Sequence, residues 1–146
     1  MKRKPARPQG VQPADAPPNA AEDPVAFAIG AARLAAEYQA TDVAVLDLRG
    51  LCNLADVFVL ATGTSDRQMA AVLGALEAYG ESLDRRPFRP SNISDTKWML
   101  ADYVDVVVHF FDAEHRSYYD LDALWGDAPR VAWEVETPRR RATGDD

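Results

Sequence analysis

The fold of this 146-residue chain is constrained most by two nearly continuous apolar runs, "DVAVLDLRG" at residues 42–50 and "DVFVLA" at residues 56–61. Successive side chains of a strand point to opposite faces of a sheet, so a run that is apolar at every position is typical of a strand buried on both faces. We therefore expect two interior strands in a sheet that other elements cover.

The remaining elements follow from hydrophobic spacing and from end signals. Asp23 and Pro24 suit the cap and first position of a helix over about 24–39, and apolar residues at i, i+3, i+4 and i+7 predict a second helix over about 66–83. The sequence also predicts a hairpin with strands at 97–102 and 105–111, a short helix capped by Asp112 and ending at Gly126, and a last strand at 131–136. This order predicts an α/β (α+β) fold, with a mixed β-sheet covered by helices.

Composition and charge divide the chain into one domain and two tails. Residues 1–22 are rich in proline and are expected to be disordered, residues 23–136 suit one domain, and residues 137–146 are expected to be flexible. The tails carry net charges of +2 and +1, which leaves −10 on the domain. An acidic domain argues against direct nucleic-acid binding and favours a basic protein partner, although acidic residues that only maintain solubility explain the charge equally well.

The compartment is indicated by cysteine content and hydropathy. Cys52 is the only cysteine, which excludes an internal disulfide and a cysteine-based metal cluster and fits a reducing cytosol. No apolar run approaches the roughly 18–20 residues that cross a bilayer, and the N-terminus lacks the apolar region of a secretory signal. We expect a cytoplasmic protein without a membrane partner.

The stretch "FVLATGTSDRQMAAVL" joins a strand to a helix through a Gly-Thr-Ser turn, which in other proteins often holds a phosphate. Ser65 and Gln68, however, form the S-x-x-Q pattern of a capping box, which satisfies the helix N-terminus without a ligand. A nucleotidyltransferase also needs paired carboxylates for Mg²⁺, and no Asp-x-Asp or Glu-x-Glu pair follows Gly63. We therefore favour capping, with no cofactor and no metal.

Other chemistry-bearing residues have simpler structural interpretations. Asp102 and Asp105 flank the predicted hairpin turn, where a metal site is conceivable but turn and cap roles are commoner. His109 lies within a strand and lacks an evident orienting partner, so a hydrogen-bonded, half-buried residue is favoured over a general base. Cys52 is expected to be a small packing residue.

Aromatic and acidic residues gather between residues 98 and 125, which favours a protein-binding face over pure core packing. Trp98 and Met99 alternate along a strand and cannot both point into one core. At least one of them must face a covering helix, a loop or a partner.

Three segments together resemble the ribosomal silencing factor family, also called Iojap-like: "VLDLRGLCNLADVFVLATGTSDRQ", "KWMLADYVDVVVHFF" and "RSYYDLDALWGDAP". The resemblance covers about residues 24–130. It implies a nucleotidyltransferase-like topology without the catalytic carboxylates and a non-enzymatic function. Members of this family bind the large ribosomal subunit through ribosomal protein L-fourteen, sterically block joining of the small subunit, repress translation under nutrient limitation and commonly form homodimers.

Carried onto this sequence, the resemblance implies partner-binding residues in two motifs. The hairpin supplies Trp98, Met99, Asp102 and Asp105, and the C-terminal motif supplies Arg116, Tyr119 and Asp120, which also suit a role in holding the last helix to the sheet. The family residues of the Gly-Thr-Ser turn are assigned to turn and cap structure: Thr62, Gly63, Thr64, Ser65 and Asp66.

The sequence departs from the family pattern in its loops. Val104 stands where the family usually has glycine, and we expect a different turn type because valine is strained at positive φ. "SNISD" replaces an acidic-glycine segment before the tryptophan, and Cys52 replaces a serine.

Two other functional classes remain open. One is a nucleotide-binding or nucleotidyl-transferring enzyme that uses the turn at Gly63. The other is an interaction scaffold with a partner other than the ribosome.

Overall fold

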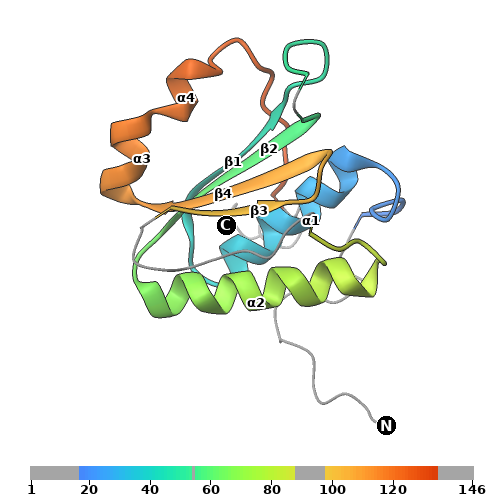
Figure 1. Ribbon diagram of the computed structural model, residues 1–146, viewed down its shortest axis with the longest axis horizontal. Helices are drawn as coiled ribbons and strands as arrows, with labels where there is room; N and C mark the ends of the chain where they lie inside the picture. The colour runs from blue at the N-terminus through green and yellow to red at the C-terminus, as the bar shows by residue number, and fades with distance from the viewer. Residues whose placement is uncertain (1–16, 54, 88–97, 135–146) are drawn as a thin grey trace, which may run out of the picture.

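A computed structural model of the protein describes residues 17–53, 55–87 and 98–134 (Figure 1). Its elements are α1 (Pro24–Glu37), β1 (Thr41–Asp47), β2 (Val57–Gly63), α2 (Asp66–Ser82), β3 (Trp98–Asp102), β4 (Val106–Asp112), α3 (Ala113–Tyr119) and α4 (Leu121–Leu124). The four strands form one sheet in the order β1-β2-β4-β3. β2 and β4 are parallel and the other two pairings are antiparallel, so the expected mixed sheet is confirmed.

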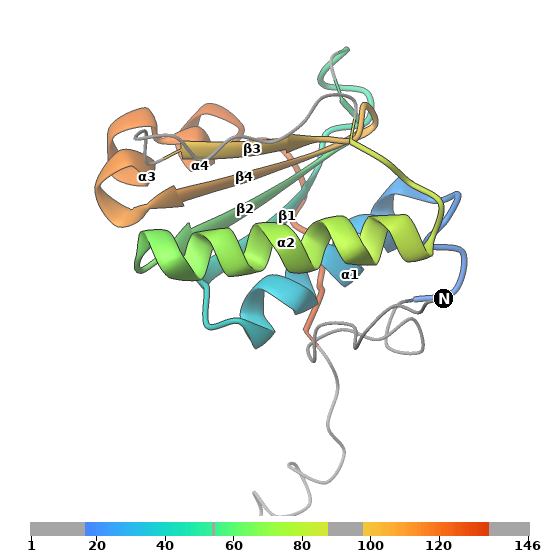
Figure 2. The same ribbon diagram turned by 60° about the horizontal axis from the view of Figure 1, so that its bottom comes forward.

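One face of the sheet is covered by α1 and α2 (Figure 2). The two helices can approach closely because Gly30 has no side chain. A Cβ at this position would overlap the hydroxyl of Tyr79. That hydroxyl donates a hydrogen bond to the carbonyl of Phe27 at 3.1 Å, and the two rings stack with centroids 5.0 Å apart. The close contact of α1 with α2 therefore depends on the absence of a side chain at one position.

The opposite face carries a smaller cluster of buried residues next to α3 and α4. Its fully or nearly fully buried members are Ala44, Leu46, Leu48, Leu60, Phe111 and Ala128. Figure 2 shows α3 and α4 at one end of this face, which they cover only in part. The sheet therefore has one completely covered face and one partly covered face.

Most predicted elements are present, but two of the C-terminal ones differ. The expected helix up to Gly126 is interrupted at Asp120, which adopts a left-handed conformation (φ 52°), ends α3 and caps α4. The expected strand over 131–136 is not a strand within residues 131–134. There, Val131 donates a hydrogen bond to the carbonyl of Val45 at 2.9 Å, beside a single bridge between Arg130 and Leu46. This segment lies along the outer edge of β1.

The domain begins earlier than composition indicates. Residues 18–22, which composition assigned to the disordered tail, form turns, and Ala20 is buried. The side chain of Arg85 donates hydrogen bonds to the carbonyls of Ala20 and Ala21 at 3.3 and 3.1 Å. The rest of the predicted tails, residues 1–16 and 137–146, lies outside the described residues.

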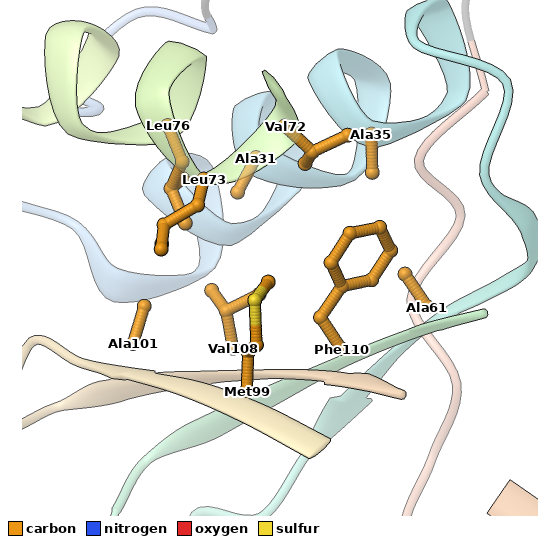
Figure 3. A pocket seen from close by; sticks show the side chains of 10 residues that line it. All are labelled: Ala31, Ala35, Ala61, Val72, Leu73, Leu76, Met99, Ala101, Val108 and Phe110. Carbon is orange, nitrogen blue, oxygen red and sulfur yellow. The ribbon is translucent and has the colours of Figure 1, made fainter. Parts of the chain in front are cut away.

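A small cavity of about 20 Å³ lies between the sheet and the two helices of the covered face (Figure 3). Ten apolar residues line it: Ala31, Ala35, Ala61, Val72, Leu73, Leu76, Met99, Ala101, Val108 and Phe110. A cavity of this size holds at most one water, and an apolar wall offers that water no hydrogen-bond partners. It is therefore a packing defect.

We expect Ala101→Val to fill this cavity and to raise the free energy of unfolding by about 1 kcal/mol. Ala101→Thr is the matched control, because threonine has the same shape and branching but places a hydroxyl in the cavity. Urea denaturation of the three proteins measures both effects. If the threonine variant is as stable as the valine variant, strand propensity and not cavity filling explains the gain.

Candidate protein-interaction surface

The Gly-Thr-Ser turn is satisfied by groups of the protein itself. The hydroxyl of Ser65 accepts a hydrogen bond from the Gln68 backbone N–H at 3.0 Å, which confirms the predicted cap. The Gln68 side-chain oxygen accepts from the Thr64 backbone N–H at 2.6 Å, and its amide donates to the carbonyl of Tyr38 at 2.9 Å. The glutamine thus closes the turn and also connects it to the C-terminus of α1.

Gly63 is required by packing. A Cβ at this position would lie 2.9 Å from the sulfur of Met69 and closer still to its Cγ. Met69 is buried, so its side chain has little room to move away. Close approach of β2 to the first turn of α2 accounts for the glycine without a phosphate.

The hairpin tip carries a strained backbone. Val104 has φ 75°, and the Asp105 N–H donates to the carbonyl of Tyr103 at 2.9 Å, which defines a γ-turn of the rare positive-φ kind. Val104 therefore adopts a positive φ in spite of its branched side chain. Two flanking interactions fix the turn: the Asp102 carboxylate accepts from the Val104 N–H at 2.8 Å, and the Tyr103 N–H donates to the Val106 carbonyl at 2.8 Å. Strain of this kind persists only where the surroundings determine the conformation.

Asp105 holds the hairpin to the rest of the domain. Its carboxylate accepts two hydrogen bonds from the Arg85 guanidinium, at 3.0 and 3.3 Å, and its carbonyl accepts from the N–H groups of Asp56 and Val57. The guanidinium lies 4.6 Å from the ring centroid of Phe27. Asp102 and Asp105 thus have the turn and packing roles that residue chemistry favoured over a metal site.

The register of the sheet places three rows of residues across its partly covered face. The row near the hairpin consists of Asp102, Val107 and Phe58, on β3, β4 and β2 in turn. The middle row consists of Leu100, His109 and Leu60. The row near α3 consists of Trp98, Phe111 and Thr62. Phe111 and Thr62 are buried, whereas Phe58, Val107 and Asp102 are half-buried and Leu100 is 40% exposed. We call Phe58, Leu100 and Val107 the open strip.

Met99 does not belong to an exposed surface. It is 2% exposed and points into the cavity below the sheet, toward α1 and α2 (Figure 3). The prediction that Met99 contributes to a contact surface is wrong, because strand alternation puts Met99 and Ala101 on the covered face and Leu100 on the other. The same alternation could have identified Leu100 and Val107 as residues of the partly covered face, once the orientation of a single residue on each strand was known.

His109 is buried beneath the open strip. It is 5% exposed, and the Phe58 ring meets it edge-on at a centroid distance of 4.5 Å. Burial lowers the pKa of His109 to about 4, against a smaller opposing effect of Asp102. The imidazole is therefore neutral at pH 7 and supports the apolar character of this face.

The C-terminal motif joins α3 and α4 to the sheet through Arg116. Its guanidinium donates two hydrogen bonds to the Asp122 carboxylate, at 3.1 and 2.8 Å, and others to the Thr62 hydroxyl and the Asp42 carbonyl. The hydrogen bond from Arg116 is the main reason that the pKa of Asp122 lies below its usual range. Arg116 and Asp120 have the structural role that was anticipated as an alternative, and the side chains of Tyr119 and Trp98 lie outside the described part of the structure.

A polar crevice adjoins this network, where the parallel strands β2 and β4 end. It has a volume of about 510 Å³ and is lined by the start of β1, by Thr62 and by residues of α3, α4 and the following segment. It could not be predicted from the sequence, because its walls come from residues up to 88 positions apart in the chain, Asp42 to Arg130.

Neither a metal-binding cluster nor a membrane-spanning helix is present among the described residues. Within residues 17–53, 55–87 and 98–134, no three His, Cys, Asp or Glu side chains are placed to share a metal ion. Of the described helices, none combines the length and apolar character of a membrane span. The geometry thus offers a partly open apolar strip, a strained hairpin tip and a polar crevice.

Residues 21–146 match the family model described as "Ribosomal silencing factor during starvation". The chain belongs to this family. It is 36% identical over 91 residues to the ribosomal silencing factor of Bacillus subtilis, which covers 62% of this chain and 77% of the relative. It is 33% identical over 119 residues to "Protein Iojap, chloroplastic" of Zea mays, covering 80% of this chain and 50% of that protein.

Solved structures agree with the family assignment of this chain. A crystal structure of a Chromobacterium violaceum protein superimposes with a TM-score of 0.62 at 28% identity, over 74% of this chain and 89% of the other. A Bacillus halodurans protein gives a TM-score of 0.59 at 29% identity, over 70% of this chain and 92% of the other.

Gly63→Ala is expected to lower the free energy of unfolding by about 2 kcal/mol, because the new methyl group collides with Met69. In a Met69→Ala background the same change should cost much less, since the colliding side chain is gone. A double-mutant cycle by chemical denaturation measures this coupling. Equal costs in both backgrounds would contradict the packing role of Gly63.

His109 should make the stability depend on pH. Because its pKa is about 4 when folded and about 6.5 when unfolded, the unfolded state binds more protons between these values, and stability falls as the pH is lowered through this range. We expect a loss of about 1.5 kcal/mol between pH 6.5 and pH 5. The His109→Leu variant should lack this loss in the same denaturation experiment, and an unchanged pH dependence would show that another group is responsible.

Proposed function

We infer that this silencing factor binds the large ribosomal subunit through ribosomal protein L-fourteen and sterically blocks joining of the small subunit. Repression of translation under nutrient limitation follows from this block. The observation that carries the proposal is the match of residues 21–146 to the ribosomal silencing factor family. Such a protein acts in the cytoplasm and needs neither a cofactor nor a catalytic step.

The open strip suits the contact with a partner. Phe58, Leu100 and Val107 form an apolar region bordered by Asp102, which is the arrangement of an apolar interface centre with a polar rim. The proposed contact surface comprises this strip together with Trp98, Asp102 and Asp105 of the hairpin, and more weakly Arg116, Tyr119 and Asp120. Met99 is excluded because it is buried.

The hairpin tip extends this surface in a fixed conformation. Val104 is 60% exposed, yet its backbone is held by hydrogen bonds on both sides of the turn. A side chain that is ordered before binding loses less conformational entropy on association than a mobile one. A valine presented in this way supports recognition of a protein partner.

Charge supports a basic partner. The domain over residues 23–136 carries a net charge of −10, so association with a basic ribosomal protein is accelerated and weakens with salt. Occupancy alone is sufficient for the block, because a folded domain on the joining surface excludes the small subunit. When not bound, the protein is expected to form a homodimer.

Two alternatives make different predictions. A nucleotide-binding enzyme would bind ATP and Mg²⁺ at the turn near Gly63, whose first backbone groups are already satisfied by Ser65 and Gln68. A scaffold for another partner would leave ribosomal subunits in the supernatant when the two are sedimented together.

Co-sedimentation with purified large subunits tests the proposal, followed by addition of small subunits at matched salt. The protein should pellet with large subunits and reduce the joined-ribosome peak, and binding should weaken as salt is raised. Leu100→Glu should weaken binding at least about tenfold because it places a charge in the open strip. Trp98→Ala should cost about 2 kcal/mol or more of binding free energy.

Leu124→Glu is the matched control, because Leu124 is an exposed leucine on α4, outside the open strip. It should bind like the natural sequence. Equal loss in the Leu100 and Leu124 variants would contradict the assigned surface. Failure to pellet at low salt, or pelleting without any effect on subunit joining, would contradict the proposed function itself.

A further inference from the structure

The polar crevice lies at the point where the chain leaves the two central strands in opposite directions. After β2 the chain passes to α2 on the covered face, and after β4 it passes to α3 on the partly covered face (Figure 2). In sheets built this way, the diverging connections leave a gap beyond the carboxyl ends of the strands, which is where α/β proteins commonly bind ligands. Its volume of about 510 Å³ is in the range of small-molecule sites.

Two of the charged groups that line the crevice neutralise each other. Arg116 donates two hydrogen bonds to Asp122 from Nε and Nη2, and its other terminal nitrogen, Nη1, donates to the Thr62 hydroxyl and the Asp42 carbonyl. Recruiting this guanidinium for a ligand would leave the Asp122 carboxylate without its main partner. The pair therefore forms part of the wall.

Three other charged groups keep most of their hydrogen-bonding capacity. Among the described residues, the Asp42 carboxylate has no hydrogen bond or ion pair, and the Asp120 carboxylate accepts only from the Ala123 N–H at 3.4 Å. Arg130 touches Asp122 at 3.5 Å, which is its one ion pair within this part of the chain. One cationic and two anionic residues with spare hydrogen-bonding capacity thus line the same crevice.

The backbone at Asp42 favours this arrangement. β1 has an irregularity between Thr41 and Ala44, and Asp42 adopts φ 50° there. Extra residues of this kind redirect a side chain out of the strand pattern. The carbonyl of Asp42 accepts a hydrogen bond from Arg116, and the residue lines the crevice.

We propose that the crevice binds a free α-amino acid with a cationic side chain, namely arginine or lysine. The ligand's carboxylate meets Arg130, and its ammonium and side-chain cation meet Asp42 and Asp120. Its net charge of +1 complements the net −1 of these three residues. Its aliphatic stem lies over the small side chains of the floor, Val43, Ala44 and Ala113.

The charges disfavour the rival ligand, a nucleotide. Polyphosphate would face the carboxylates of Asp42, Asp120 and Asp122 with a single available guanidinium, that of Arg130. The amino-acid proposal is independent of ribosome binding, and its test contains no ribosomes.

The test is an NMR titration of the ¹⁵N-labelled full chain with L-arginine at constant ionic strength. Saturable shifts should appear at amides around the crevice, including those of Thr62 and Ser117. L-citrulline, whose side chain is neutral, and agmatine, which lacks the carboxylate, should each bind about tenfold more weakly. ATP should cause no shifts at these amides.

Variants assign the roles of the residues. Asp42→Asn should weaken L-arginine binding about tenfold, and Arg130→Gln should do the same without affecting agmatine, which has no carboxylate to lose. Asp84→Asn is the matched control, because Asp84 is an exposed aspartate that also has positive φ, 61°, but does not line the crevice. Asparagine tolerates such a backbone, so these aspartate variants should fold.

Four results would overturn the proposal. The first is the absence of saturable shifts with L-arginine. The second is equal weakening by Asp42→Asn and Asp84→Asn, which would indicate general attraction to an acidic protein. The third is binding of ATP at the same amides, which would contradict the charge argument against a nucleotide. The fourth is equal binding of agmatine and L-arginine, which would exclude the assigned recognition of the carboxylate.

Discussion

β2 and β4 run parallel across seven paired positions, from Val57 with Val106 to Gly63 with Asp112. Parallel neighbours cannot be joined by a tight turn, so the chain between them has to leave the sheet and return. That connection contains α2 and β3, and it covers one face with α2. After β4 the chain moves to the other face, where α3 and α4 are too short to cover it. The fully covered face, the open strip and the crevice all follow from this one pairing.

Much of this architecture could be predicted from the sequence because its signals are local. Apolar runs located β1 and β2, and the Ser65 and Gln68 pattern located the start of α2. The failures involve information that local patterns do not hold. Strand alternation indicated that Trp98 and Met99 lie on opposite faces of the sheet, but not which face the helices cover. The helix break at Asp120 depends on a single residue in a left-handed conformation. The Arg116 network joins residues more than 50 positions apart, so no spacing rule could reveal it.

The Gly-Thr-Ser turn shows how a strand-turn-helix pattern that often holds a phosphate can have a purely structural role. Its glycine allows contact with Met69, its serine caps α2, and Gln68 occupies the backbone N–H of Thr64. Two backbone N–H groups at this turn, those of Thr64 and Gln68, are thus engaged by side chains of the same protein. Fold and function are separable in this sense, and the functional assignment rests on family membership and on the surface of the sheet.

Arg85 binds the carbonyls of Ala20 and Ala21 with the same guanidinium that holds Asp105 at the hairpin turn. The entry of the chain into the domain and the tip of the hairpin are therefore mechanically coupled through a single side chain. A pulling force applied upstream of residue 17 would load Arg85 before it loads α1, and would reach the turn at Val104 through Asp105. A force applied through an N-terminal fusion is thus transmitted to the hairpin, whereas a force applied through a C-terminal fusion is transmitted to the edge of β1.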